Sequence, residues 1–142
     1  MWNYFIIHRL GLGLKRKIEK FKIGEVFSQN KNEIVFGFYN EKKDQFYWIL
    51  NLDPSFPHMR FSDNFSRARR NSVNLFTEIT DEKIKSLELH QGERSFHLEL
   101  QNGSCIYFKL HGGRSNVILK SESKTTIFRT NLEKDYDYEL PN

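Results

Sequence analysis

The feature that most constrains the fold is an alternation of apolar and polar residues that begins at Ile84 and lasts to about Arg129. A period of two places alternate side chains on one face of a sheet. The apolar members of this pattern are Leu87, Leu89, Phe96, Leu98, Leu100, Ile106, Phe108, Leu110, Val117 and Leu119. Asn102-Gly103 lies between two of these runs and favours the positive φ angles of a two-residue hairpin. This half of the chain therefore predicts a meander of antiparallel strands with one apolar face.

The first half predicts a helix followed by three more strands. The opening segment carries apolar residues at steps of three and four, which form one face of a helix: Ile7, Leu10, Leu14, Ile18 and Phe21. Residues 25–28, 34–39 and 45–52 are rich in β-branched and aromatic residues and are separated by polar turns, as strands are. Two prolines then set a loop at residues 53–57 that ends the third strand.

A second helix is expected over residues 63–78. Ser62 or Asp63 is placed to cap its N-terminus, and its apolar side is supplied by Val73, Leu75 and Phe76. Together these elements predict an α+β fold that is mainly antiparallel β. The expected architecture is a β-sandwich or open barrel flanked by two helices.

The length of 142 residues leaves room for one domain and hardly for two. We assign residues 1–132 to this domain and interpret the acidic segment 133–142 as a linker toward a further domain. The only cysteine, Cys105, excludes an intrachain disulfide, so nothing indicates an oxidising compartment. No apolar run approaches the roughly 20 residues of a membrane span. A cytoplasmic protein without a membrane partner is expected.

The sequence lacks the motifs that catalysis would need. Gly11-Leu12-Gly13 is not followed by the Gly-Lys-Ser/Thr of a phosphate-binding loop. The five histidines are not spaced as metal ligands, and one cysteine completes no zinc pattern. No Gly-x-Ser-x-Gly nucleophile elbow occurs. We therefore expect a non-enzymatic binding protein without catalytic residues, metal ions or cofactors.

The formal net charge of +4 permits a polyanionic partner without requiring one. Two clusters concentrate the positive charge: Lys15, Arg16 and Lys17 in the predicted first helix, and Arg67, Arg69 and Arg70 in the predicted second. Each cluster is either a contact to nucleic-acid phosphates or a solvated surface. Arginine suits phosphate geometry better than lysine, which favours the second cluster.

Three motifs are not explained by structural propensity: Asp53-Pro54-Ser55-Phe56-Pro57-His58, Gly92-Glu93-Arg94, and the run from Gly112 to Leu119. They follow the first helix and a strand that ends in Val26-Phe27-Ser28-Gln29. In this order they resemble the N-terminal domain of the NFACT family, the group of RqcH and fibronectin-binding protein A. The resemblance covers about residues 4–140 and is most specific in Ser115-Asn116-Val117-Ile118-Leu119.

The resemblance implies a fold, a function and a set of contacts. The implied fold is that of the N-terminal domain of formamidopyrimidine-DNA glycosylases, a β-sandwich with helices. The family acts in ribosome-associated quality control: it binds the large ribosomal subunit that carries a stalled peptidyl-tRNA, recruits tRNA, and continues into further modules. The implied partners are tRNA, the large ribosomal subunit and the further domains of the full-length protein. The implied contacts are Glu93, Arg94, Arg114, Ser115 and Asn116.

Alternatives stay open for these residues and for the function. Glu93-Arg94 is otherwise a solvated hairpin turn, and Arg114-Ser115-Asn116 a structural turn that satisfies local backbone groups. A fibronectin-binding, adhesin-type protein-interaction module is a second possible function. A degenerate glycosylase-like nucleic-acid-binding domain is a third. Catalysis of that last kind is disfavoured because the chain starts Met1-Trp2-Asn3 and lacks the N-terminal proline nucleophile.

Overall fold

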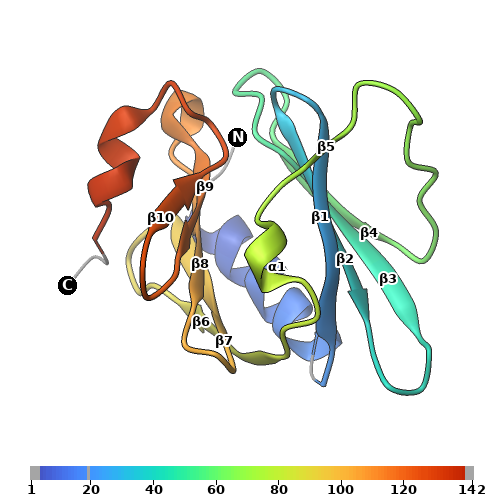
Figure 1. The fold of residues 1–142 in the computed structure, drawn as a ribbon. Coiled ribbons are helices and arrows are strands. Elements are labelled where there is room, and N and C mark those ends of the chain that lie inside the picture. Colours follow the sequence, from blue (N-terminus) through green and yellow to red (C-terminus); the bar gives the residue numbers. More distant parts are fainter. Residues whose placement is uncertain (1–3, 19, 140–142) are drawn as a thin grey trace.

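Two antiparallel sheets packed face to face make up most of the protein (Figure 1). The computed structural model describes residues 4–18 and 20–139. The first sheet has the strand order β4-β3-β2-β1-β5. Its strands are β1 (Lys22–Asn30), β2 (Glu33–Tyr39), β3 (Gln45–Asn51), β4 (His58–Ser62) and β5 (Val73–Asn74). The prediction of an α+β fold dominated by antiparallel strands is confirmed, and the sheets form a sandwich instead of a closed barrel.

The second sheet is the meander that the period of two predicts. Its order, β10-β9-β8-β7-β6, pairs each strand with its neighbour in sequence. The strands are β6 (Ile84–Leu89), β7 (Ser95–Leu100), β8 (Cys105–Lys109), β9 (Asn116–Lys120) and β10 (Thr125–Ile127). At the predicted hairpin Gly103 adopts a φ of 91°, and the Ser104 N–H donates to Asn102 Oδ1 at 2.9 Å.

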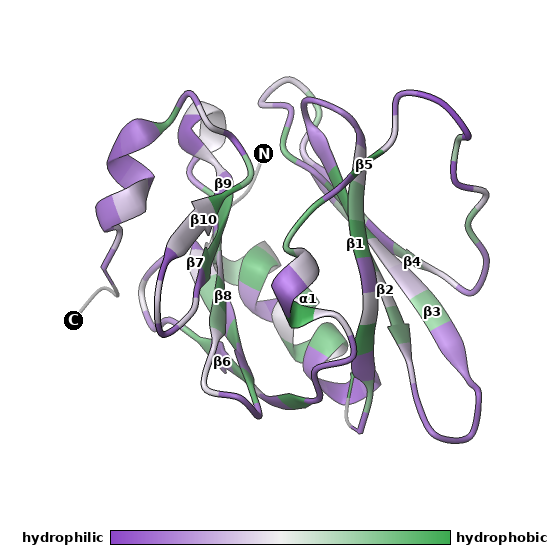
Figure 2. Ribbon diagram, viewed as in Figure 1, coloured by the Kyte–Doolittle hydropathy of each residue, from purple (hydrophilic) through white to green (hydrophobic). Residues whose placement is uncertain are grey.

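Aromatic side chains join the inner faces of the two sheets. Trp48 of β3 is completely buried, and its ring centroid lies 5.4 Å from that of Phe36 in β2 and 4.8 Å from that of Phe108 in β8. Full burial of one such side chain stabilises the fold by roughly 1.5–3 kcal/mol. Figure 2 shows the hydrophobic residues on the strands and the helix, whereas the loops are mostly hydrophilic.

The single α-helix of the described residues, α1 (Tyr4–Lys17), lies between the sheets (Figure 1). Ile7 and Leu14 of its predicted apolar face are completely buried in the common core. A Cβ atom at Gly11 would lie 2.4 Å from Leu89 Cδ2, so glycine allows α1 to pack closely on β6. No helix in the described part of the chain is long and apolar enough to cross a membrane.

The prediction of a second helix over residues 63–78 is wrong. This segment is mainly an exposed loop that ends in the two-residue strand β5 and a 3-10 turn, η1 (Thr77–Ile79). Asn71 and Phe76 adopt positive φ angles of 58° and 50°, which a helix cannot contain. Ser62 exchanges hydrogen bonds with Asn64 and so forms a local turn instead of a helix cap. Tertiary pairing with β1 at Phe27 and Ser28 draws the chain into the sheet.

The segment expected to be an acidic linker packs partly on the domain. Residues Glu133–Asp137 form a 3-10 turn, η3, that contacts β9 and β10. Asp135 is buried there, and Tyr138 packs against Tyr107 with ring centroids 5.8 Å apart. Residues of this segment as far as Tyr138 therefore pack on the second sheet. Residues 140–142 lie outside the described residues.

Candidate binding cleft

Turns from both sheets meet at one end of the sandwich, which we call the motif end (top of Figure 1). It consists of the β1–β2 turn and the loop after β3 in the first sheet, and of residues 91–94, 110–115 and 129–131 in the second. In the first sheet the Leu52 N–H donates to the Asn32 carbonyl at 2.7 Å. In the second the Leu110 N–H donates to the Arg94 carbonyl at 2.9 Å. Parts of all three sequence motifs are therefore brought to this end.

Arg129 connects the two sheets across the motif end. Its Nη2 donates to Asn32 Oδ1 at 2.7 Å and to the Leu52 carbonyl at 3.1 Å, both in the first sheet. Its Nη1 donates to the Ser115 carbonyl, 3.4 Å away in the second sheet. Burial lowers the pKa of Arg129, and the nearby Asp53 carboxylate opposes this shift. A guanidinium stays charged in proteins. Arg129 is therefore a permanently charged link between the two sheets, which we call the Arg129 clasp.

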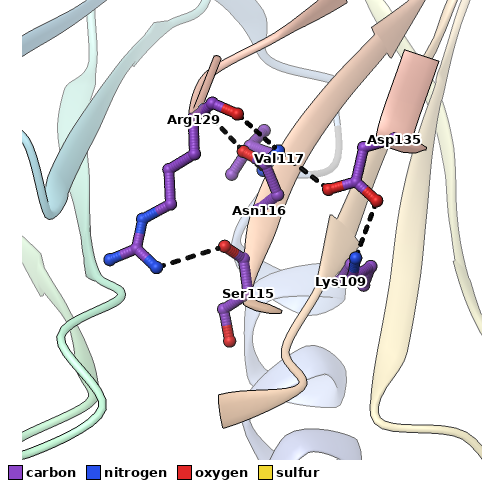
Figure 3. A network of polar contacts seen from close by, with 6 residues as sticks. All are labelled: Lys109, Ser115, Asn116, Val117, Arg129 and Asp135. Atoms are coloured by element: carbon purple, nitrogen blue, oxygen red, sulfur yellow. Dashed lines mark hydrogen bonds and ion pairs between the residues drawn. The ribbon is translucent and has the colours of Figure 1, made fainter. Parts of the chain in front are cut away.

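Asn116 extends the pairing of β9 and β10 with its side chain (Figure 3). Ile118 pairs with Ile127, so Asn116 lies opposite Arg129 in the same register. The Arg129 N–H donates to Asn116 Oδ1 at 2.7 Å, and Asn116 Nδ2 donates to the Arg129 carbonyl at 3.2 Å. The side-chain amide thus makes the two hydrogen bonds that a strand backbone would make. Asn116 holds the segment that carries the Arg129 clasp.

A buried ion pair fixes the turn beyond Arg129 (Figure 3). Lys109 Nζ lies 2.7 Å from Asp135 Oδ1, and Asn116 Nδ2 donates to Asp135 Oδ2 at 2.9 Å. Lys109 and Asn116 are paired neighbours on β8 and β9. Both oxygens of the Asp135 carboxylate are therefore satisfied, as a buried charge requires. The network tethers η3 to the second sheet.

A cleft of about 580 Å³ opens at the motif end between the edge of the first sheet and the segment after β10. Its walls come from residues 28–32 and 128–131, with Pro54, Asn71, Val73 and Leu75 at the sides. Side-chain amides dominate its polar lining: Gln29, Asn30, Asn32, Asn71 and Asn131. Amides offer hydrogen-bond donors and acceptors without charge. The lining suits recognition of a surface that is partly polar, and its described residues include no nucleophile paired with a general base.

The Glu93-Arg94 pair lies in the turn before β7, where Gly92 adopts a φ of 78°. Arg94 is exposed and Glu93 is partly buried. Both charges act on His111, whose pKa is lowered by burial first and then by Lys109 and Arg94, while Glu93 opposes the shift. Arg94 is thus accessible from solvent.

The run Arg114-Ser115-Asn116 divides into an exposed and a buried part. Arg114 is exposed at the end of the 3-10 turn η2 (Gly112–Arg114), which starts at Gly112 with a φ of 60°. Ser115 and Asn116 are completely buried. Their expected contact with nucleic acid is therefore corrected: the structural alternative applies, because Asn116 is committed to Arg129 and Asp135.

Neither basic cluster lines the cleft, but the second lies next to it, because the Ala68 N–H donates to the cleft residue Gln29. Arg67 covers the outer face of the first sheet, with its guanidinium carbon 4.2 Å from the Phe27 ring centre and Nη1 3.2 Å from Glu25 Oε1. Arg69 and Arg70 are exposed in the neighbouring loop. The residues Lys15, Arg16 and Lys17 are exposed at the end of α1. From there β1 runs nine residues before it reaches the motif end.

Besides the network of Arg129 and Asp135, sequence reasoning missed a polar cluster on the outer face of β6 and β7. The ring nitrogens His90 Nε2 and His97 Nδ1 are 2.7 Å apart, and His90 Nδ1 lies 2.7 Å from the Ser95 hydroxyl. Burial lowers the pKa of both histidines, that of His90 to about 4. The pairing of Leu89 with Phe96 would have revealed this proximity. Within the described part of the chain, no three His, Cys, Asp or Glu side chains are grouped to hold a metal ion.

Solved structures with the same fold carry names of binding proteins. The N-terminal domain of fibronectin-binding protein PavA from Streptococcus pneumoniae matches with a TM-score of 0.72 and 15% identity, over 90% of this chain and 54% of that one. The N-terminal part of the fibronectin/fibrinogen-binding protein of Streptococcus suis matches with a TM-score of 0.72 and 16% identity, over 90% and 53%. The fibrinogen-binding protein of Staphylococcus aureus matches with a TM-score of 0.60 and 15% identity, over 83% and 49%.

This chain therefore spans about half the length of those chains. At such identities the likeness establishes the fold, and it agrees with the expected resemblance to the fibronectin-binding protein group at that level. No family model matches the sequence, and neither does any curated protein.

Proposed function

We propose that this protein is a non-enzymatic protein-binding module that takes a segment of a large protein, such as fibronectin or fibrinogen, into the cleft at the motif end. The observation that carries the proposal is the lining of the cleft, where amide side chains are combined with an apolar rim. At the rim Val73 is 60% exposed. The names of the structural neighbours supply the class of partner.

The charge of the cleft also favours a protein over a polyanion. Among the described lining residues the cations are Lys31 and Arg129, and Arg129 is already bound to Asn32, Leu52 and Ser115. Affinity for nucleic acid depends on several free cations that neutralise phosphates together. Protein interfaces instead combine an apolar contact with a rim of polar groups. The cleft combines apolar residues such as Val73, Leu75 and Phe128 with uncharged amides, and in this mixture it is closer to a protein interface than to a phosphate site.

Binding to immobilised fibronectin and fibrinogen tests the proposal, with serum albumin as the reference surface. Changing Val73→Asp places a charge at the apolar rim and should weaken binding at least about tenfold. Leu12→Asp is the matched control because Leu12 is an exposed apolar residue of α1 outside the cleft. Absence of binding to both proteins, or equal loss in the two variants, would refute the assignment to this cleft.

A second candidate function is the tRNA- and ribosome-binding module of a quality control factor. Arg94 and Arg114 favour it, because both are exposed at the motif end within the motifs that resemble that family. Binding of bulk tRNA across a salt series tests it, with Arg94→Ala compared with Arg60→Ala on the exposed edge strand β4. Binding that falls steeply with salt and is lost only in Arg94→Ala, without fibronectin or fibrinogen binding, would replace the first proposal.

A further inference from the structure

A smaller cavity of about 300 Å³ lies on the outer face of the first sheet. The side chains that line it include Glu25, Tyr39, Gln45, Tyr47 and Asp81. Tyr39 and Gln45 flank the β2–β3 turn, whereas the cleft at the motif end involves the β1–β2 turn. The two hollows therefore lie toward opposite ends of the same sheet.

Two glycines create the space for this cavity. A Cβ atom at Gly37 would lie 3.1 Å from both Glu25 Cγ and Tyr47 Cε1, and one at Gly24 would lie 3.0 Å from Tyr39 Cδ1. The two tyrosine rings thus lie against the sheet over backbone that carries no side chain. Both tyrosines are partly exposed, and Tyr47 also packs against Phe65 with ring centroids 5.7 Å apart.

The cavity combines these rings with two carboxylates. The Tyr39 hydroxyl donates to Asp81 Oδ1 at 2.6 Å, and Glu25 Oε1 accepts from Arg67 Nη1 at 3.2 Å. The hydrogen bond to Asp81 and its charge raise the pKa of Tyr39, so that the phenol stays neutral. One oxygen of each carboxylate has no assigned partner among the described residues. None of the described residues that line the cavity is Lys or Arg.

The same face of the sheet already binds one guanidinium group in this manner. Arg67 lies 4.2 Å above the Phe27 ring while it donates to Glu25. Guanidinium groups stack on aromatic faces and form directed hydrogen bonds with carboxylates. We propose that the cavity between Tyr39 and Tyr47 is a second site of this kind, which binds the guanidinium of an arginine side chain presented by a protein partner.

Titration of the isotope-labelled protein with N-acetyl-arginine amide tests this site by NMR. The amide signals of Gly24 and Gly37 report binding directly, and N-acetyl-citrulline amide is the neutral isostere of the ligand. We expect saturable shifts with the arginine compound, with a Kd on the order of millimolar for so small a ligand, and none with citrulline. The measurement does not involve the cleft at the motif end, so its outcome is independent of the first proposal.

Variants separate the parts of the site. Tyr47→Leu removes an aromatic face and should weaken binding about threefold or more. Tyr47→Phe keeps the ring and should bind as the unchanged protein does. Asp81→Asn should weaken binding by a similar factor, and asparagine tolerates the φ of 68° at this position. Equal shifts with citrulline, the absence of saturation, or unchanged affinity in both Tyr47→Leu and Asp81→Asn would overturn the proposal.

Discussion

Removal of the Asp135 carboxylate should destabilise the protein far more than its position in a terminal acidic segment suggests. The side chains of Lys109 and Asp135 are 11% and 6% exposed and form the 2.7 Å ion pair below Asn116. Asp135→Ala leaves the Lys109 ammonium buried without its counter-charge, which costs about 3–5 kcal/mol. A domain of this size has a free energy of unfolding of roughly 5–15 kcal/mol in total. The variant therefore loses a large fraction of its stability.

Urea unfolding followed by the fluorescence of the buried Trp48 measures this loss. Asp137→Ala is the matched control, because Asp137 is an exposed acid in the same turn. It should change the free energy of unfolding by less than about 0.5 kcal/mol. The double change Lys109→Met with Asp135→Leu should recover stability relative to Asp135→Ala, since it removes both charges. A loss below about 1 kcal/mol in Asp135→Ala would refute the reasoning.

Two further predictions concern the helix and the histidine pair. Gly13→Ala, whose methyl group meets nothing within 4 Å, should raise the free energy of unfolding by about 0.5–1 kcal/mol. Gly11→Ala should show no such gain, because its methyl group must displace the Leu89 side chain. Thermal unfolding of the two variants checks this contrast. The folded pKa of His90 is about 4, below the ordinary value of 6.5, and that of His97 is also lowered, so protonation opposes folding. The contribution of the neutral histidines to the free energy of unfolding is fully present above pH 6.5 and is lost as the pH falls toward 4. In the double variant His90→Asn with His97→Asn, the free energy of unfolding should change less with pH over this window. An unchanged pH profile of unfolding would contradict the assignment.

Local patterns predicted the second sheet well. The apolar residues of β7 alternate strictly, and Asn102-Gly103 joins β7 to β8. Each of these signals is a property of neighbouring residues, and the observed pairing is between neighbouring strands. The helix α1 was predicted for the same reason, because its apolar face repeats within a few turns.

Residues 63–78 show where such reasoning fails. A helix over this segment would have an apolar side made of Val73, Leu75 and Phe76. The segment instead pairs with β1 as the short strand β5. The candidate contacts show the same limit. Asparagine is common in exposed turns. Asn116 is instead completely buried, because the register of β9 and β10 places it opposite Arg129.

The amino-acid sequence alone was sufficient to establish the α+β class, the antiparallel meander and the hairpin at Asn102-Gly103, because period and turn chemistry act between residues close in the chain. Three features instead depend on contacts between distant segments: the clasp of Arg129 on Asn32 and Leu52, the ion pair of Lys109 with Asp135, and the cavity over Gly37. Each joins side chains that approach one another only after the sheets have paired and packed, and so no local pattern in the sequence encodes it.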